Sequence, residues 1–224
     1  MKRVKGFTLA EVLITLGIIG VVAALTAPAL IQNAGNAKIG PTLQKVKSTI
    51  ENANEHILYE NEASDLYSVA GNNTVAYMEL LSKYISGSSY ESNTAAPNVA
   101  AYNGEYTVKD SYVFYFSNAV TIFFNSTSDW STSKGSFEED YLRAIVDING
   151  ADREPNVLGK DIFDFHVSRN GIVVPTGSKT YKWLRGDDYY WNSTGDLCCN
   201  DTTVGTGAGC SGSIFDNNLK VIYQ

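Results

Sequence analysis

The sequence predicts an α+β fold in which one long N-terminal helix packs against an antiparallel β-sheet, with a disulfide-tied C-terminal loop region. Three observations lead to this fold class. Residues 7–31 are almost continuously apolar, residues 32–60 repeat apolar side chains at helical spacing, and short aromatic and β-branched runs follow between turn residues. We therefore divide the chain into residues 1–6, 7–31, 32–60 and 61–224, the last being an α+β head.

The first two segments have the pattern of a membrane anchor. A basic leader with Lys2, Arg3 and Lys5 precedes the apolar run of residues 7–31. At about 1.5 Å of rise per residue, this run forms a helix long enough to cross a hydrocarbon core of about 30 Å. Positive charge on the N-terminal side, with no comparable cluster just after the run, predicts a cytoplasmic N-terminus and an exported head.

Glu11 is the one acidic residue inside the apolar run. A carboxylate within a membrane-spanning helix costs roughly 2.5 to 3.5 kcal/mol on insertion scales, so such a residue usually has a function and a partner. We expect no group in the same helix to satisfy it, because the leader cations precede Gly6. The sequence therefore predicts that Glu11 meets a positive charge from elsewhere.

These residues resemble the N-terminal signature of type IV prepilins and type II secretion pseudopilins. The resemblance covers about the first thirty residues and is carried by Lys5-Gly6-Phe7-Thr8-Leu9-Ala10-Glu11, then Ile18-Ile19-Gly20, Ala23-Ala24 and Pro28. It departs at Ala10, where the family usually has a larger aliphatic residue. The resemblance implies that a prepilin peptidase cleaves between Gly6 and Phe7 and methylates the new N-terminal Phe7.

The resemblance also implies a function as a structural subunit of a type IV pilus or a type II secretion pseudopilus. Its partners would be other pilin subunits, the prepilin peptidase and an inner-membrane assembly platform. The subunit would first cross the inner membrane once and then enter a surface pilus or a periplasmic pseudopilus. In a helical stack, Glu11 of one subunit would neutralise the Phe7 ammonium of the next. The sequence does not distinguish a major pilin, a minor pilin and a pseudopilin.

Two alternatives remain at this stage. A cleavable signal peptide ending at Ala27-Pro28-Ala29 would give a mature chain beginning at Leu30, although the position of Glu11 and the length of the apolar run argue against it. A membrane-anchored or secreted surface binding domain, adhesin-like in function, would use the tyrosine-rich stretch of residues 87–109 to bind a ligand. Packing of those tyrosines against the sheet is the simpler interpretation.

The segment after Pro28 predicts an amphipathic helix. Its apolar residues recur at spacings of four and three: Ile39, Leu43, Val46, Ile50, Ala53 and Ile57. This stripe would cover one face of the sheet. We expect Pro28 to kink or locally break the helix and Gly35, Gly40 and Pro41 to allow a second bend, so an unbroken helix across residues 33–41 is not expected.

The head begins with a turn-rich stretch at 60–71, a short helix at 75–85 and an extended surface connection at 87–109. The predicted strands are residues 112–116, 120–124, 141–148, 162–168 and 172–174. Asn170-Gly171 predicts a type I′ turn between the last two strands. Short connections imply an antiparallel sheet with one face in need of a cover.

An Asp/Asn/Gly-rich stretch at residues 147–156 is the one candidate metal loop. Asp147, Asn149 and Asp152 place hard oxygen ligands around Gly150, and Asn156 and Asp161 follow closely. Calcium takes six to eight such oxygens, but the run lacks EF-hand spacing. An Asx-turn, in which Asp147 and Asn149 bond to their own backbone, explains the same residues, and we favour it. We expect no other cofactor.

All three cysteines lie near the C-terminus, which in an exported protein predicts one disulfide and one remaining thiol. Cys210 would pair with Cys198 or Cys199, and the sequence leaves that choice open. A zinc site is incomplete, because the two histidines, His56 and His166, lie far away in the sequence.

Composition and motifs argue against two classes of function. A net charge of −7 and a pI near 4.8 do not fit a nucleic-acid-binding protein, which needs a basic surface. The chain has no G-x-S-x-G, no H-E-x-x-H and no phosphate-binding glycine loop, so we expect it not to be an enzyme. His166 lies in an alternating strand pattern and is expected to be a half-exposed structural residue.

Overall fold

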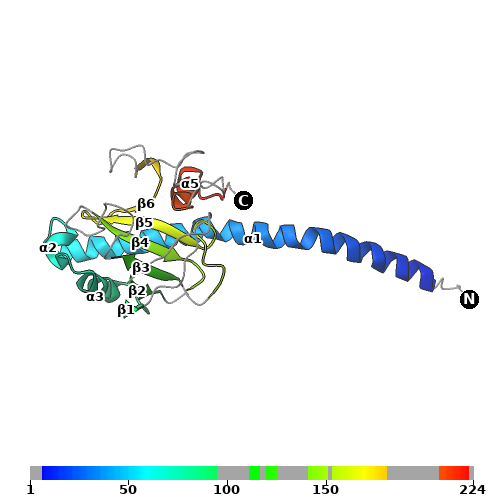
Figure 1. Ribbon diagram of the computed structural model, residues 1–224, viewed down its shortest axis with the longest axis horizontal. Helices are drawn as coiled ribbons and strands as arrows, with labels where there is room; N and C mark the ends of the chain where they lie inside the picture. The colour runs from blue at the N-terminus through cyan, green and yellow to red at the C-terminus, as the bar shows by residue number, and fades with distance from the viewer. Residues whose placement is uncertain are drawn as a thin grey trace, which may run out of the picture. The chain divides into compact units, whose positions relative to one another are not determined.

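The computed structural model describes residues 7–94, 111–116, 120–125, 141–150, 153–180 and 207–221. Two compact units are distinguished, Met1–Lys38 and Ile39–Gln224. The helices are α1 (Leu9–Glu60), α2 (Leu66–Ala70), α3 (Thr74–Tyr84) and α5 (Cys210–Asp216). The strands are β1 (Ser89–Thr94), β2 (Ser111–Tyr115), β3 (Thr121–Asn125), β4 (Tyr141–Asp147), β5 (Ile162–Ser168) and β6 (Val173–Pro175) (Figure 1).

Helix α1 is continuous over 52 residues, so the predicted interruption between residues 33 and 41 is wrong. Pro28, Gly35, Gly40 and Pro41 all lie inside it. Each proline removes only one backbone donor, and the hydrogen bonds of the turns on either side are enough to continue the helix. The apolar run and the amphipathic stripe therefore belong to one helix (Figure 1).

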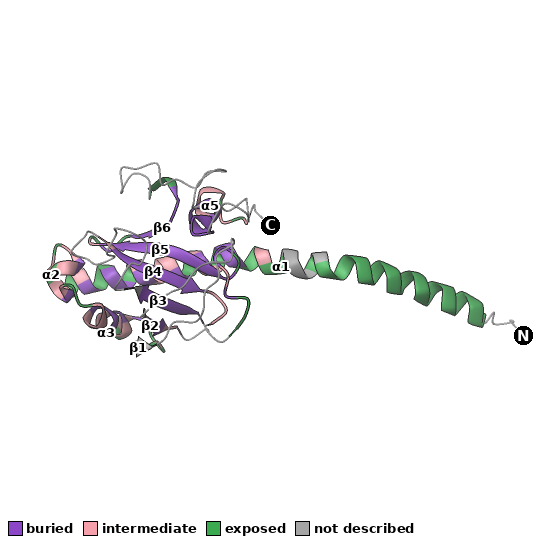
Figure 2. Ribbon diagram, in the orientation of Figure 1, coloured by how far each residue is buried: buried purple, intermediate pink, exposed green. Residues whose placement is uncertain are grey.

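The amphipathic stripe of α1 is confirmed in full. All six of its members, from Ile39 to Ile57, are buried, and apart from Gly40 and Asn54 the residues between them are exposed or half-buried. Figure 2 shows the contrast along α1: buried residues recur in its C-terminal half and exposed residues fill its N-terminal half.

The sheet has six antiparallel strands in the order β1-β2-β3-β4-β5-β6, so each strand pairs with its neighbour in sequence. Tyr112 pairs with Phe124 between β2 and β3, and Ala144 pairs with Phe165 between β4 and β5. Five strands were predicted to within one residue at each end. The sixth, β1, lies at the edge and was predicted as part of an extended connection, because its sequence SYESNT is polar. A polar edge strand discourages pairing with other chains.

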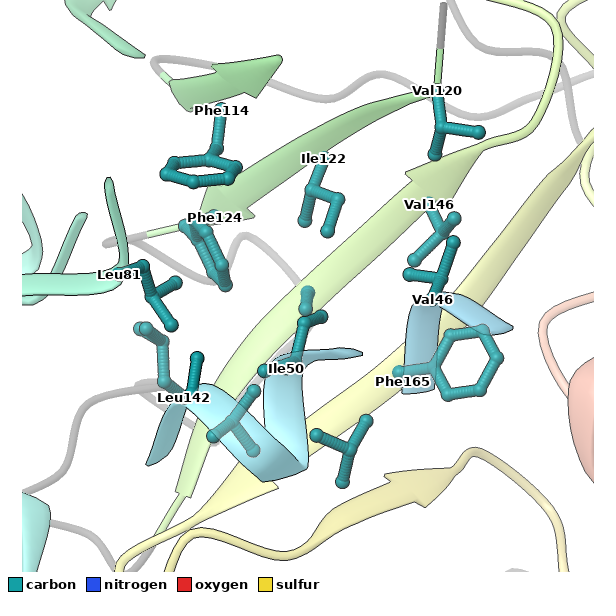
Figure 3. Close-up of a cluster of buried hydrophobic side chains, with 14 of the residues drawn as sticks. Val46, Ile50, Leu81, Phe114, Val120, Ile122, Phe124, Leu142, Val146 and Phe165 are labelled. Atoms are coloured by element: carbon teal, nitrogen blue, oxygen red, sulfur yellow. The ribbon is translucent and has the colours of Figure 1, made fainter. Parts of the chain in front are cut away.

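The main core lies between α1, α3 and one face of the sheet. Figure 3 shows Val46 and Ile50 of α1 beside side chains from β3, β4 and β5. Tyr77 of α3 meets Phe124 edge to face, with ring centroids 5.6 Å apart. The stripe on α1 therefore covers the sheet as predicted.

The opposite face of the sheet is also buried, although the sequence predicted a cover for one face only. Its apolar cluster consists of Val113, Phe123, Ile145, Leu158 and Ile162. Strand β5 is buried at every position. This face also carries the buried ion pair of Arg143 and Asp164, whose Nη2 and Oδ2 atoms are 2.6 Å apart.

Polar bonds fix α1 against the hairpin of β5 and β6. The Asn54 amide donates to the carbonyl oxygen of Gly171 at 2.8 Å and accepts from the Tyr77 hydroxyl at 2.8 Å. Glu51 accepts from the backbone N–H of Val173 at 3.0 Å. Since all these partners lie far apart in sequence, the bonds define one orientation of α1 on the sheet.

The turn at Asn170-Gly171 is not type I′ as predicted. Gly171 has a positive φ of 85°, whereas Asn170 is not among the residues with positive φ. The N–H of Gly171 donates to the carbonyl of Ser168, and the N–H of Ser168 donates to the carbonyl of Ile172. This is a three-residue loop that ends in a glycine bulge.

Helix α5 packs on β5 and β6 although its sequence, CSGSIFD, gave no helical signal. The Ser211 hydroxyl donates to the carbonyl of Asp164 at 2.5 Å, and the Gly212 N–H donates to the carbonyl of Thr176 at 2.9 Å. Cys210 and Ile214 join the main core. The C-terminal region therefore contributes to the core.

Substitution of Gly40 tests how closely α1 approaches Leu219, which follows α5 in the chain. A Cβ at Gly40 would lie 2.0 Å from the backbone oxygen of Leu219, whereas a Cβ at Gly35, in the same helix, would have nothing within 4 Å. We expect Gly40→Ala to destabilise the head by about 1–3 kcal/mol through overpacking. Gly35→Ala should be neutral or stabilising, since alanine is the better helix former by about 1 kcal/mol. Thermal denaturation of the two variants compares them, and equal melting temperatures would contradict the close approach.

Candidate functional site: the exposed apolar helix

The N-terminal half of α1 exposes a continuous apolar surface. The stretch Leu9–Pro28 is 20 residues long, apolar enough to cross a membrane, and none of it is buried. Its exposed large side chains are Leu9, Val12, Leu13, Ile14, Leu16, Ile18, Ile19, Val21, Val22 and Leu25. An exposed apolar surface of this size marks a contact with lipid or with other protein chains.

Polar groups within this apolar stretch are satisfied inside the helix. The Thr15 hydroxyl donates to the carbonyl oxygens of Glu11 and Val12, both at 2.9 Å. The Thr26 hydroxyl donates to the carbonyl of Val22 at 2.9 Å. The free-energy cost of placing Thr15 and Thr26 in a medium without hydrogen-bonding groups is therefore small, since both hydroxyls already have acceptors.

Glu11 has a partner in its own helix, which corrects the prediction that it has none. Thr8 caps the helix N-terminus, and its backbone N–H and hydroxyl donate to Glu11 Oε2 at 2.8 Å and 2.9 Å. The Glu11 N–H in turn approaches the Thr8 hydroxyl at 3.3 Å. This is a capping box, and the pattern Thr8-x-x-Glu11 was its overlooked sequence signal. No positive charge takes part in these bonds.

The capping box places the Glu11 carboxylate beside the residue that follows Phe7. Phe7 itself is 88% exposed.

Residues 1–27 match the family model of the prokaryotic N-terminal methylation motif. The chain carries the type IV pilin and pseudopilin signature. No curated protein and no solved structure matches the chain. The signature indicates a pilin-like or pseudopilin precursor, and its matched range includes Gly6, Phe7 and Glu11.

In the head, the loop after β4 contains an Asx-turn at Asp147, as predicted. Asp147 Oδ1 accepts from the N–H groups of Asn149 and Gly150 at 3.0 Å and 2.9 Å. Asp161 ties down the other side of the loop: Oδ1 accepts from Val157 N, and Oδ2 accepts from Asn156 N. Asp152 lies outside the described residues.

Burial raises the pKa of Asp147 to about 6, although the two backbone N–H groups oppose this and the Asp161 carboxylate adds to it. Among the described residues, no three His, Cys, Asp or Glu side chains gather as a metal-binding group. Any cation in this loop would therefore depend on asparagine or backbone oxygens as well as on the two aspartates.

The remaining candidate residues do not meet in one site. Cys210 is the buried first residue of α5, while Cys198 and Cys199 lie outside the described residues, so the disulfide remains a prediction. His166 is buried, which corrects the expected half exposure, and its Nδ1 lies 3.0 Å from the Thr176 hydroxyl. His56 stacks on Tyr84. Each histidine therefore contacts a neighbouring side chain of the head, and the two do not meet in one site.

Proposed function

We propose that this protein is a structural subunit of a type IV pilus or a type II secretion pseudopilus. The observation that supports it most is the exposed, acid-bearing apolar helix of α1, which begins inside the matched methylation motif. A prepilin peptidase would remove residues 1–6 and methylate Phe7. The inner-membrane assembly platform and other pilin subunits are the remaining proposed partners.

In this proposal the apolar half of α1 serves twice. It anchors the subunit in the inner membrane before assembly and packs among copies of itself in the filament afterwards. Both surroundings are apolar, so little hydrophobic free energy changes on transfer, and helix packing with specific polar contacts determines the arrangement.

Glu11 supplies the specific polar contact. Cleavage after Gly6 would create an ammonium group on Phe7, one residue before the backbone N–H that Glu11 accepts from. Glu11 of one subunit would neutralise this ammonium in the next subunit, since each charge alone is costly in an apolar medium.

Mass spectrometry of the mature protein tests this proposal. We expect the N-terminal peptide to begin at Phe7 and to carry one added methyl group. Gly6→Val should leave the leader uncleaved and abolish filaments, whereas Val4→Ala, a change in the same leader, should be processed normally.

A mature chain that begins at Met1 would contradict the proposal, and one that begins at Leu30 would support a signal peptide instead. Detection of processed subunits in sheared surface filaments would favour a pilus. Their retention in the periplasm, with normal processing, would favour a pseudopilus.

A further inference from the structure

We propose that a groove between α1 and the turn before β6 binds an extended segment of a partner protein that carries basic side chains at alternate positions. This inference does not depend on the proposed assembly function. The groove has a volume of about 300 Å³ and lies within the unit Ile39–Gln224. It is lined by residues of α1 and of the turn that joins β5 to β6: Glu51, Glu55, Leu58, Asn170, Gly171 and Ile172.

Exposed apolar side chains gather at this groove. Ile172 is 47% exposed and Tyr59 is 81% exposed, and no other large hydrophobic side chain is exposed in the described part of Ile39–Gln224. Ile172 lines the groove, and Tyr59 follows Glu55 by four residues, on the same face of α1. Exposed apolar residues that gather at one place indicate a binding surface, whereas scattered ones do not.

Two carboxylates border the apolar part of the groove. Glu51 Oε1 accepts from the Val173 N–H at 3.0 Å and from the Lys47 ammonium, which holds this carboxylate at the groove edge. Glu55 is exposed, and its carboxylate has no hydrogen-bond or ion-pair partner among the described residues. Because Lys47 offsets part of the Glu51 charge, Glu55 is the main source of uncompensated negative charge in the groove.

Lysine and arginine side chains match this combination of apolar surface and negative charge. Their apolar stems can lie along Leu58 and Ile172 while their charged ends reach a carboxylate. Glu51 and Glu55 are four residues apart on one helix, which places their Cβ atoms about 6 Å apart. In an extended chain, side chains two positions apart point the same way at a separation of about 6.6 Å. The spacing therefore fits alternate basic residues of an extended segment.

The charge of the chain favours a different protein over a second copy as the occupant. The net charge is −7, so two copies of the chain repel each other at long range. A positively charged partner is attracted instead, and charge complementarity raises its rate of association.

Fluorescence anisotropy of labelled peptides, titrated with the full-length protein in non-ionic detergent, tests the proposal. The probe is the peptide Gly-Lys-Ser-Lys-Gly. Gly-Lys-Lys-Ser-Gly has the same composition with adjacent lysines, and Gly-Gln-Ser-Gln-Gly lacks the charge. We expect the probe to bind saturably and about fivefold more tightly than the adjacent-lysine peptide, the difference expected for one partly exposed ion pair. Equal affinity of all three peptides, or no saturable binding of the probe, would overturn the proposal.

Two variants locate the site. Glu55→Gln should weaken binding of the probe about fivefold, and Ile172→Ser should weaken it about threefold, because a lysine stem loses an apolar contact. Glu79→Gln makes the same charge change at an exposed position of α3, outside the groove, and should leave the affinity unchanged. Thermal denaturation shows whether each variant keeps its fold.

The two remaining outcomes both contradict the proposal. Undiminished affinity of Glu55→Gln and Ile172→Ser for the probe would place the peptide elsewhere on the protein. Self-association of the full-length protein that is lost in Glu55→Gln, without binding of the probe, would make a second copy of the chain the occupant.

Discussion

Glu11→Gln should insert into the membrane and undergo cleavage at normal levels, yet yield less than about one tenth of the normal filament mass. Removing one partner of a buried ion pair costs about 3–5 kcal/mol, and each 1.4 kcal/mol is a tenfold change in an equilibrium constant. Quantification of sheared filaments against total membrane-bound protein gives the ratio that checks this result.

Glutamine separates the charge of Glu11 from its capping role. A glutamine at this position still completes a capping box with Thr8, whereas alanine does not. If the charge drives assembly, the glutamine and alanine variants will be equally defective. Thr15→Val, a change in the same helix that removes only an internally satisfied hydroxyl, should assemble normally. Normal filament yield from Glu11→Gln would exclude the ammonium contact as the basis of assembly.

Arg143→Leu should lower the melting temperature of the head more than any surface change. Arg143 binds Asp164 through Nε at 3.0 Å and 3.1 Å and through Nη2 at 2.6 Å, and both residues are buried. The substitution leaves the Asp164 carboxylate buried without this guanidinium. We expect a loss of about 3–5 kcal/mol, or about 6–20 °C, measured by thermal denaturation of the full-length protein in detergent.

The double variant Arg143→Leu/Asp164→Leu tests the reason for that loss. It should recover part of the stability, because apolar replacement of a whole buried pair is often neutral. Lys47→Ala is the control, since it breaks the half-exposed pair of Lys47 and Glu51 on α1 and should cost less than about 1 kcal/mol. A double variant less stable than Arg143→Leu would mean that Asp164 has a further stabilising role of its own.

Much of the fold could be predicted because its apolar patterns are strong. A helical period is clear in the stripe from Ile39 to Ile57, and the aromatic, β-branched runs of β2 and β3 are typical of strands. Strand β1 and helix α5 were missed because SYESNT and CSGSIFD have little apolar periodicity; pairing with β2 and packing on β5 decide their conformation. Tertiary context overrides weak local preference in both segments.

The candidate-site residues show the same difference: local patterns could be read from the sequence, whereas contacts between distant segments could not. The Thr8-x-x-Glu11 pattern is local, and it was readable in the sequence although it was overlooked. In contrast, the role of Asp161 could not be read, because its bonds to Asn149 and Asn156 depend on how the chain returns from β4 to β5. Buried oxygens without a hydrogen-bond partner, such as Asp147 Oδ2, likewise require coordinates, since burial of an individual atom has no sequence signature.

The backbone contact between Gly40 and Leu219 has a consequence for biogenesis. A ribosome must synthesise the chain as far as Leu219 before this contact can form, well after residues 7–31 have emerged. Loop closure over such a distance is slow, so a nascent head would remain incomplete until then. A chain that ends before Leu219 lacks this contact and should therefore be cleaved by proteases more readily than the chain that includes it.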